Sequence, residues 1–237
     1  LNLWVEERHK DFFASRYRVE SVLFSKQSRY QKVDVVETSD FGRMLLNDGL
    51  VMVSDRDEAI YHEMIAHVPL LVHPSPKSVL IIGGGDGGTA REVLRHPEVQ
   101  GCLMIEIDGV VVEASKQYLP QMAVAFDHPK LQVDIADGVQ FVEQTEQRFD
   151  VVLVDSTDPI GPAQPLFGEE FYNNVWKILN PNGIVVAQGE SPFFETEMQR
   201  KMLSLASQRF EIATFYNFAN LTYPGGLCSF LYASNGS

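Results

Sequence analysis

A series of carboxylates follows the apolar segments in the second part of this 237-residue chain. Most of these segments have four or more apolar residues without a polar break, which is typical of a buried strand. The acids that follow them are Asp86, Glu106, Asp108, Asp137, Asp155, Asp158 and Glu190. Because the carboxyl ends of parallel strands meet at one edge of a sheet, we expect these acids to face one crevice. Carboxylates gathered in this way are costly without cations, so they predict a cationic ligand.

The first of these acids lies in a glycine-rich loop that follows the apolar residues 79–82. Gly83, Gly85 and Gly88 fit the pattern G-x-G-x-x-G, and the residues from position 89 onward read as a helix. Glu106 lies about twenty residues further on, where an acid can accept hydrogen bonds from ribose hydroxyls. The combination predicts a ligand that contains a nucleoside.

Asp86 occupies a loop position where a phosphate or a carboxylate would normally meet backbone N–H groups. Two unit charges about 4 Å apart interact by roughly 4 kcal/mol at an effective dielectric near 20, so an anion there would bind several hundred-fold more weakly. The loop therefore favours a cation, and both a dinucleotide pyrophosphate and the carboxylate of S-adenosylmethionine fit it poorly. The alternative is that Asp86 points to solvent or caps the following helix.

Two aspartates, Asp155 and Asp158, follow the apolar residues 151–154. Pro159 and Pro162 prevent the strand from continuing and fix a loop. Both carboxylates can then face one ligand amine; the alternative is that they make only local turn hydrogen bonds.

Four other positions carry polar groups that a ligand could use. Asp137 and Gly138 place a carboxylate beside a backbone amide, which together can recognise an adenine edge. Gln31 shares the apolar face of an expected strand, so it is either a satisfied structural amide or a ligand contact. Tyr61 lies in an expected helix, where taken alone it is more typical of a core aromatic residue.

The elements that must position these residues belong to two regions. We expect an N-terminal antiparallel β-domain over residues 1–54 and a Rossmann-like domain over residues 55–237. The expected N-terminal strands cover residues 16–25, 29–38, 43–47 and 50–53. The later strands are expected at 78–83, 102–107, 131–135, 149–155, 183–188, 210–217 and 227–233, with helices at 89–96, 109–119, 138–147, 169–179 and 195–208. This α/β alternation predicts a mostly parallel seven-stranded sheet, and the short connection before the last strand predicts that it is antiparallel.

A further helix is expected to start at residue 57, with one apolar stripe along it. The stripe consists of Ile60, Met64, Val68 and Leu71. Pro69 is expected to kink or end the helix. Tyr61 and His62 would lie beside the stripe, near its edge.

Composition limits the classes of partner. The chain has 19 Lys and Arg against 32 Asp and Glu, a formal net charge of −13, which disfavours nucleic acid and anionic membranes. The two cysteines, Cys102 and Cys228, lack metal-ligand spacing. We expect no signal peptide and no membrane span, since no apolar run in the sequence approaches the length that a span needs. We therefore expect a cytoplasmic protein. Because the chain begins with Leu1, we expect that its start is trimmed.

Taken together, the motifs resemble those of the spermidine synthase family of polyamine aminopropyltransferases. The motifs are IYHEM at 60–64, VLIIGGGDGG at 79–88, IEID at 105–108, ADG at 136–138, VDSTDPIGP at 154–162 and TYPGG at 222–226. The resemblance covers nearly the whole chain. It implies a small β-domain joined to a methyltransferase-like Rossmann domain, assembled as a homodimer or homotetramer.

The resemblance also implies roles for the matching residues. The methylthioadenosine part of decarboxylated S-adenosylmethionine would be held by Gln31, Glu106, Asp137, Gly138 and Pro162. Asp86 would hold the aminopropyl ammonium, and the putrescine side would be lined by Tyr61, His62, Asp155, Asp158 and Tyr223, with Asp155 as proton acceptor. Leu221 and Gly225 stand where many relatives have proline and serine, which bears on the choice of acceptor amine.

The implied reaction is aminopropyl transfer to putrescine, which gives spermidine and methylthioadenosine without a metal or redox cofactor; the donor is a co-substrate. Asp158 or Glu190 would then anchor the distal ammonium. Cadaverine, agmatine and spermidine are alternative acceptors. Three other functions remain open: a methyltransferase that uses S-adenosylmethionine, a nicotinamide-dependent oxidoreductase, and a polyamine-binding protein without catalysis.

Overall fold

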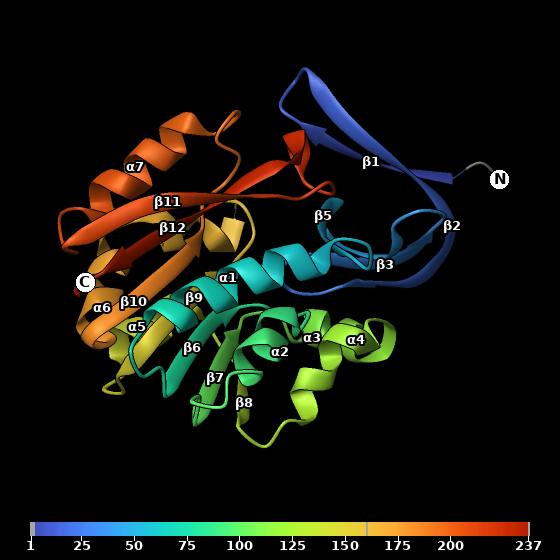
Figure 1. The fold of residues 1–237 in the computed structure, drawn as a ribbon. Helices are drawn as coiled ribbons and strands as arrows, with labels where there is room; N and C mark the ends of the chain where they lie inside the picture. The colour runs from blue at the N-terminus through green and yellow to red at the C-terminus, as the bar shows by residue number, and fades with distance from the viewer. Residues whose placement is uncertain (1–2, 160, 237) are drawn as a thin grey trace.

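The computed structural model describes residues 3–159 and 161–236, which form two β-sheets with helices around the larger one (Figure 1). Ile160, within the expected aspartate loop, lies outside the described residues, as do Leu1, Asn2 and Ser237.

The N-terminal sheet is antiparallel and follows chain order. Its strands are β1 (Leu3–His9), β2 (Phe13–Gln27), β3 (Lys32–Thr38), β4 (Gly42–Asn47) and β5 (Leu50–Ser54). The expected strands correspond to β2 to β5, but β1 was not expected and β2 is longer at both ends. The first part of β2 pairs with β1, from Leu3↔Val19 to His9↔Phe13, whereas Lys26 and Gln27 at its other end pair with β3. The many charged residues of β1 and β2 hide the period-two pattern.

The larger sheet has seven strands in the order β11-β12-β10-β9-β6-β7-β8. They are β6 (Ser78–Gly83), β7 (Gly101–Glu106), β8 (Leu131–Ile135), β9 (Phe149–Asp155), β10 (Leu179–Gln188), β11 (Ile212–Ala219) and β12 (Leu227–Ser234). In this sheet β12 runs antiparallel to the other six strands, and it pairs with both β10 and β11. The predicted α/β fold with an antiparallel last strand is confirmed.

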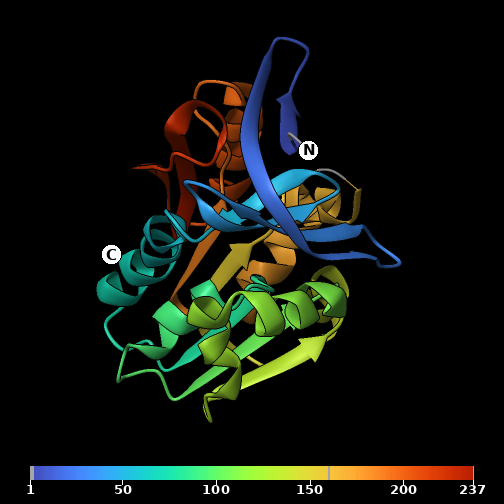
Figure 2. The same ribbon diagram turned by 90° about the vertical axis from the view of Figure 1, so that its right-hand side faces the viewer.

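Helices cover both faces of the larger sheet. They are α1 (Glu58–Val72), α2 (Gly88–Leu94), α3 (Gly109–Tyr118), α4 (Pro120–Ala123), α5 (Gly138–Gln144), α6 (Glu169–Ile178) and α7 (Thr196–Ala206), with short 3₁₀ turns at Val124–Asp127, Gly161–Phe167 and Pro224–Gly226. One core cluster joins α5, α6 and α7 to the sheet, and a second joins α1 and α2 to the opposite face. Figure 2 shows the N-terminal sheet crossing one end of this three-layer arrangement.

The buried face of α1 differs from the expected stripe. Ile60 is 41 % exposed and Leu71 is 76 % exposed, whereas Tyr61, Ile65 and Leu70 are buried. The stripe prediction was therefore wrong by one position, because apolar residues occupy adjacent positions of this helix and periodicity alone does not choose between them. The helix also continues to Val72, beyond its internal proline.

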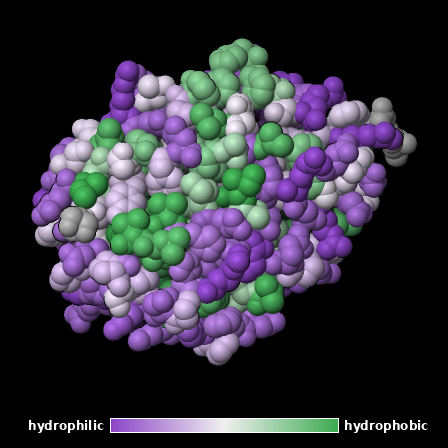
Figure 3. All heavy atoms as spheres, viewed as in Figure 1, coloured by the Kyte–Doolittle hydropathy of each residue, from purple (hydrophilic) through white to green (hydrophobic). Residues whose placement is uncertain are grey.

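The turn between β1 and β2 carries an exposed apolar surface. In Figure 3 apolar atoms gather at the top of the view, over this turn, where Phe12 is 72 % exposed. Further along the hairpin, Phe13 stacks on Phe194, and Lys10 donates a hydrogen bond to the Phe194 carbonyl at 2.6 Å. These contacts fix the N-terminal hairpin to the loop that follows β10.

Candidate active site

The glycine loop between β6 and α2 lies against the end of β9. Gly83 has a φ of +85°, and a Cβ atom at this position would lie 2.0 Å from the carbonyl oxygen of Asp155. Gly84 donates its N–H to the same carbonyl oxygen at 2.9 Å. No side chain fits between the two segments, so the glycine loop and the aspartate loop are held in contact.

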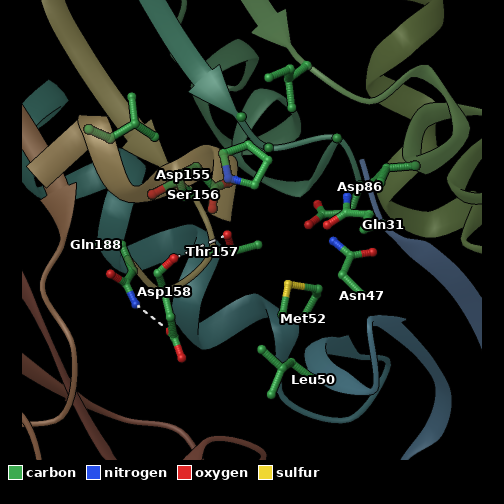
Figure 4. A pocket seen from close by; sticks show the side chains of 18 of the residues that line it. Gln31, Asn47, Leu50, Met52, Asp86, Asp155, Ser156, Thr157, Asp158 and Gln188 are labelled. Carbon is green, nitrogen blue, oxygen red and sulfur yellow. Dashed lines mark hydrogen bonds between the residues drawn. The ribbon is translucent and has the colours of Figure 1, made fainter. Parts of the chain in front are cut away.

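A cavity opens where these loops meet the N-terminal sheet (Figure 4). Among the residues named from the sequence, it is lined by Gln31, Tyr61, Asp86, Glu106, Asp137, Gly138, Asp155, Asp158, Pro162, Glu190 and Tyr223. Figure 4 shows Asp86 and Gln31 on one side and Asp158 with Gln188 on the other. The carboxyl ends of the strands thus bring most of the expected residues together.

Asp155, at the end of β9, is held by two hydroxyl groups. Tyr61 donates to Oδ1 at 2.9 Å, and Thr89, in the first turn of α2, donates to Oδ2 at 2.6 Å. Burial and the charge of Asp86 raise the pKa of Asp155 above its ordinary value. Asp155 is therefore oriented, and it is a better proton acceptor than a carboxylate in water.

Asp86 both faces the cavity and stabilises the start of α2. Its Oδ1 accepts the N–H of Gly88 at 2.6 Å and lies 3.3 Å from Nε2 of His62. Burial opposes ionisation, but the charge of His62 and the Gly88 N–H hold the pKa of Asp86 below its usual range. The helix-capping alternative is thus partly correct, yet both contacts use Oδ1, which leaves Oδ2 for a ligand.

His62 does not line the cavity; it lies behind Asp86 and is 2 % exposed. Its Nδ1 is 2.6 Å from Oε2 of Glu58, so both ring nitrogens face carboxylates. Carboxylates only accept hydrogen bonds, so both nitrogens must donate and the ring is an imidazolium. Burial alone would lower the pKa of His62, but Asp86 and Glu58 raise it to about 10. His62 therefore acts on a ligand only through Asp86.

Arg91 completes the buried charge chain behind the glycine loop. Its Nη1 and Nη2 each lie 2.9 Å from a carboxylate oxygen of Glu58, a two-point ion pair. Because Glu58 is shared by Arg91 and His62, the chain alternates in charge from α2 through α1 to Asp86. The two neighbouring carboxylates stabilise the buried imidazolium of His62, whose charge would be costly to bury without them.

Glu106 lines the cavity beside Gly85, where any other residue would clash with it. A Cβ atom on Gly85 would lie 2.8 Å from Oε2 of Glu106. The other oxygen, Oε1, accepts the N–H of Asp108 at 2.8 Å. Burial raises the pKa of Glu106 to about 7, so this carboxyl group is poorly solvated and lies ready for a hydrogen-bond donor.

Asp108, the other acid in this part of the chain, points away from the cavity. Its Oδ1 accepts the N–H of Val110 at the start of α3. Its Oδ2 accepts from Ser28 at 2.7 Å and from the amide of Gln31 at 3.2 Å. Asp108 therefore anchors Gln31, which lies one residue before β3 rather than within it. Both interpretations of Gln31 apply, since its amide is satisfied and it also lines the cavity.

Asp137 caps α5, as its Oδ1 accepts the N–H of Val139 at 2.8 Å. It still lines the cavity together with Gly138, whose position admits no side chain because a Cβ atom would lie 2.5 Å from Ile82. A planar group of a ligand can therefore approach the backbone of Gly138 closely.

Tyr223 lies in the closing segment before β12 and donates its hydroxyl to the Met52 carbonyl. The preceding residue, Thr222, is held by Asp57, which accepts its N–H at 2.8 Å. The aromatic ring of Tyr223 meets Tyr61 edge-on, with the ring centroids 5.9 Å apart. Tyr223 therefore offers an aromatic wall to the cavity rather than a free hydroxyl.

Two cavity residues, Glu7 and His9, come from β1 and were missed from the sequence. Their strand was not expected, and no signal in the sequence separates Glu7 from the acidic residue before it. Glu7 is 7 % exposed, and burial together with the charge of Asp158 raises its pKa to about 7. Glu190 also lines the cavity, and burial together with the charge of Asp158 raises its pKa to about 8.

Outside the cavity, Glu63, His67 and Glu92 have spacing that could hold a metal ion. Glu92, however, already accepts from Arg91 at 2.7 Å and from Arg95 at 2.6 Å, so its charge is compensated. The two cysteines are buried and unbonded. Within residues 3–159 and 161–236, no helix is long and apolar enough to cross a membrane.

Comparison with known proteins identifies relatives over nearly the full chain. Residues 58–237 match the spermine/spermidine synthase domain, and residues 3–55 match the spermidine synthase tetramerisation domain. The polyamine aminopropyltransferase of Bacillus cytotoxicus is 44 % identical over 234 residues, which cover 99 % of this chain and 85 % of that protein. The polyamine aminopropyltransferase of Desulforudis audaxviator is 47 % identical over 234 residues, which again cover 99 % of this chain and 85 % of that protein.

Solved structures agree with the sequence matches. A crystal structure of spermidine synthase in complex with the transition-state analogue AdoDATO superposes with a TM-score of 0.96 at 40 % identity, covering 99 % of this chain and 80 % of that one. The spermidine synthase of Thermotoga maritima gives a TM-score of 0.93 at 39 % identity, with 99 % and 79 % covered. This chain therefore belongs to the spermine/spermidine synthase family.

Proposed function

We propose that this protein is an aminopropyltransferase that moves the aminopropyl group of decarboxylated S-adenosylmethionine to putrescine, giving spermidine and methylthioadenosine. The observation that carries the proposal is the carboxylate of Asp86, which lies in the glycine loop, lines the cavity and is only 13 % exposed. An anion is disfavoured beside it, whereas the ammonium of a decarboxylated donor gains a charged hydrogen bond.

The donor is proposed to bind along the ends of β6, β7 and β8. Glu106 would accept hydrogen bonds from the ribose hydroxyls through Oε2, the oxygen not used by the Asp108 N–H. Asp137 and Gly138 would meet the adenine edge. Gln31 and Pro162, which line the same cavity, would close over the methylthioadenosine.

The proposed reaction is an in-line displacement. A neutral primary amine attacks the carbon bonded to the sulfonium, the C–N bond forms, and the C–S bond breaks as methylthioadenosine leaves. The proton lost by nitrogen passes to Asp155, which Tyr61 and Thr89 orient. Alignment of nitrogen, carbon and sulfur supplies a large part of the acceleration.

Deprotonation of the amine is the difficult step, because an alkylammonium has a pKa of about 10.4, near that of lysine. Three features favour the neutral nucleophile. The sulfonium of the donor and the imidazolium of His62 both repel a second cation, and the raised pKa of Asp155 makes it a better base. In this arrangement His62 keeps one oxygen of Asp86 occupied and orients the other toward the donor.

The acceptor is proposed to extend from Asp155 toward Asp158. These aspartates are three residues apart, so their Cα atoms are separated by at most about 10 Å, which suits a short aliphatic diamine. Gln188 donates to Asp158 at 3.5 Å, and Glu190 lies on the same wall. Asp158 and Glu190 would bind the distal ammonium.

We further propose that the chain divides into functional units at residues 1–54 and 55–237 and assembles as a homodimer or homotetramer. Exposed Leu3, Trp4 and Val22 border a groove on the outer face of the N-terminal sheet, which offers an apolar surface for a second copy. We propose a cytoplasmic location, with which two unbonded cysteines agree. The displacement involves no net oxidation or reduction, so we propose no redox cofactor. We also propose no metal.

The test is a mass-spectrometric turnover assay with decarboxylated S-adenosylmethionine and a panel of amines, run beside S-adenosylmethionine. We expect methylthioadenosine and an amine extended by one aminopropyl group, with putrescine as the preferred acceptor. Release of S-adenosylhomocysteine would instead establish a methyltransferase. Amine binding without any product would establish a binding protein.

A further inference from the structure

Asp57 lies immediately before α1, yet its side chain does not cap this helix. It is 4 % exposed, and it accepts no hydrogen bond from the first turn of α1. An aspartate at this position ordinarily accepts the N–H of the second or third helical residue. The carboxylate of Asp57 is therefore available for a contact elsewhere in the fold, and it binds a residue 165 positions later in the chain.

That residue is Thr222, which lies between β11 and β12. Oδ2 of Asp57 accepts the Thr222 N–H at 2.8 Å, and Oδ1 accepts the Thr222 hydroxyl. Oδ1 also accepts the hydroxyl of Ser54, the last residue of β5, at 2.7 Å. The Thr222 carbonyl oxygen accepts the hydroxyl of Tyr17, in β2, at 2.8 Å. The N–H, the hydroxyl and the carbonyl of Thr222 are thus all bonded, and the residue is buried.

Thr222 attaches the closing segment, residues 220–226, to the N-terminal sheet. Figure 1 shows the connection between β11 and β12 extending to β5. Among the described residues, every hydrogen bond that joins this segment to the rest of the molecule involves Thr222 or Tyr223. Leu221, on the other side of Thr222, is 67 % exposed. The position of Tyr223 therefore depends on the buried residue that precedes it.

Tyr223 connects this attachment to the reacting groups. Its ring lines the cavity and meets the ring of Tyr61 edge-on, with the centroids 5.9 Å apart. Rings from β11 and β12 also pack against Tyr61. Tyr61 in turn donates its hydroxyl to Oδ1 of Asp155 at 2.9 Å. A displacement of the closing segment would therefore change the packing around the tyrosine that orients Asp155.

We propose that Asp57 is a positioning residue of the reaction, which acts by fixing Thr222 and with it the aromatic ring of Tyr223. That ring supports Tyr61 in the orientation in which its hydroxyl contacts Asp155. This inference rests on the proposed function. Because Asp57 does not itself line the cavity, its effect belongs to kcat rather than to donor affinity. A displacement of about 1 Å at a reacting group can lower the rate by about 100-fold.

The experiment measures kcat and methylthioadenosine affinity in two variants. Thr222→Val keeps the shape of threonine without its hydroxyl, and Asp57→Ser can still cap α1 but is too short to bind Thr222. We expect kcat to fall about 10- to 100-fold in both, with methylthioadenosine affinity within about threefold of wild type.

Two further variants serve as rescue and control. Thr222→Ser keeps the hydroxyl that Asp57 accepts, so its kcat should stay within about threefold of wild type. The matched control is Thr214→Val, at an exposed position of β11, which should change neither kcat nor methylthioadenosine affinity.

A double-mutant cycle separates positioning from a general loss of structure. Tyr61→Phe lacks the hydroxyl that contacts Asp155. In this background Thr222→Val should lower kcat by less than about threefold further, because both changes act on the same contact. Fully additive losses, or an unchanged kcat in Thr222→Val, would overturn the proposal. Tyr17→Phe replaces any variant that does not fold and is put through the same cycle, because it removes only the hydroxyl bound to the Thr222 carbonyl.

Crystal structures of the variants test the geometry without turnover. In Thr222→Val the distance from the Tyr61 hydroxyl to Oδ1 of Asp155 should exceed about 3.5 Å, the limit of a hydrogen bond. In Thr222→Ser it should stay near the 2.9 Å of wild type. An unchanged contact in Thr222→Val would overturn the positioning role. Failure of the wild type to form any aminopropylated product would overturn the proposed function instead, and the structures would still decide whether Thr222 positions Tyr61.

Discussion

Nδ1 of His62 lies 2.6 Å from Oε2 of Glu58, one turn earlier on α1, and its Nε2 lies 3.3 Å from Oδ1 of Asp86, so this buried histidine is a cation. The ring fits only because residue 88 is glycine, since a Cβ atom there would lie 2.2 Å from it. Gly88 of the glycine loop therefore makes room for the histidine behind Asp86.

The charge of His62 should make stability depend on pH. Its pKa is raised from 6.5 in the unfolded chain to about 10, so the folded protein holds this proton more tightly. The resulting stabilisation is complete below pH 6.5 and is lost as pH rises through 10. We expect the free energy of unfolding of wild type to fall by a few kcal/mol, on the order set by the shift, over this range.

The variant His62→Gln separates this effect from other titrations. Glu7, Glu106 and Glu190 also have raised pKa values, and their protonated forms favour the folded state in the same direction. Denaturant unfolding at pH 7 and pH 9.5 should therefore give a clearly smaller difference in His62→Gln than in wild type. An identical difference in both proteins would show that His62 is not a buried cation.

Asp155→Asn should lower kcat by about 10²- to 10⁴-fold, the usual contribution of a general base. Asparagine can still accept from Tyr61 or Thr89, so the site should stay ordered and methylthioadenosine binding should be retained. Rapid-quench turnover and calorimetry measure the two properties. Asp134→Asn is the control, because Asp134 contacts Gln132 on β8 outside the cavity. Near-normal turnover in Asp155→Asn would refute its role as proton acceptor.

Much of the larger sheet could be predicted because its signals are local. Apolar runs mark β6, β7 and β9, and the acids that follow them meet for a topological reason, since parallel strands end at one edge. Asp155 and Asp86 were therefore identifiable as neighbours before any distance was known.

The contribution of the N-terminal hairpin could not be predicted in this way. Glu7 reaches the cavity through hairpin pairing and through contacts such as Phe13 with Phe194, far apart in sequence. Nothing local distinguishes it from Glu6. His62 posed the same difficulty, because its position behind Asp86 depends on how α1 packs against α2.

Gly83→Ala should destabilise the fold and abolish activity together. Its Cβ atom would lie 2.0 Å from the Asp155 carbonyl oxygen, and alanine is strained at a φ of +85°. We expect the free energy of unfolding to fall by at least about 2 kcal/mol, measured by urea denaturation. Gly101→Ala is the matched control, since a Cβ atom there meets nothing within 4 Å. Equal stability of the two variants would contradict the close packing of the two loops.

Binding of putrescine should release protons at pH 7. Glu190 has a pKa raised to about 8, so it is largely protonated in the free enzyme, and a nearby ammonium favours its ionised form. Calorimetric titrations in two buffers of different ionisation enthalpy give the number of protons released. Glu190→Gln should release fewer protons than wild type. Proton uptake, or the same release in the variant, would place the ammonium elsewhere.

The most direct test of the account is donor discrimination by Asp86. Wild type should bind decarboxylated S-adenosylmethionine at least about 100-fold more tightly than S-adenosylmethionine, because the extra carboxylate of the latter faces the anion of Asp86, which is only partly exposed. Asp86→Asn should bring this ratio below about 10 while methylthioadenosine, which has no ammonium, binds nearly as before. Equal affinity of wild type for the two donors, or an unchanged ratio in Asp86→Asn, would contradict the assignment of this loop to a decarboxylated donor.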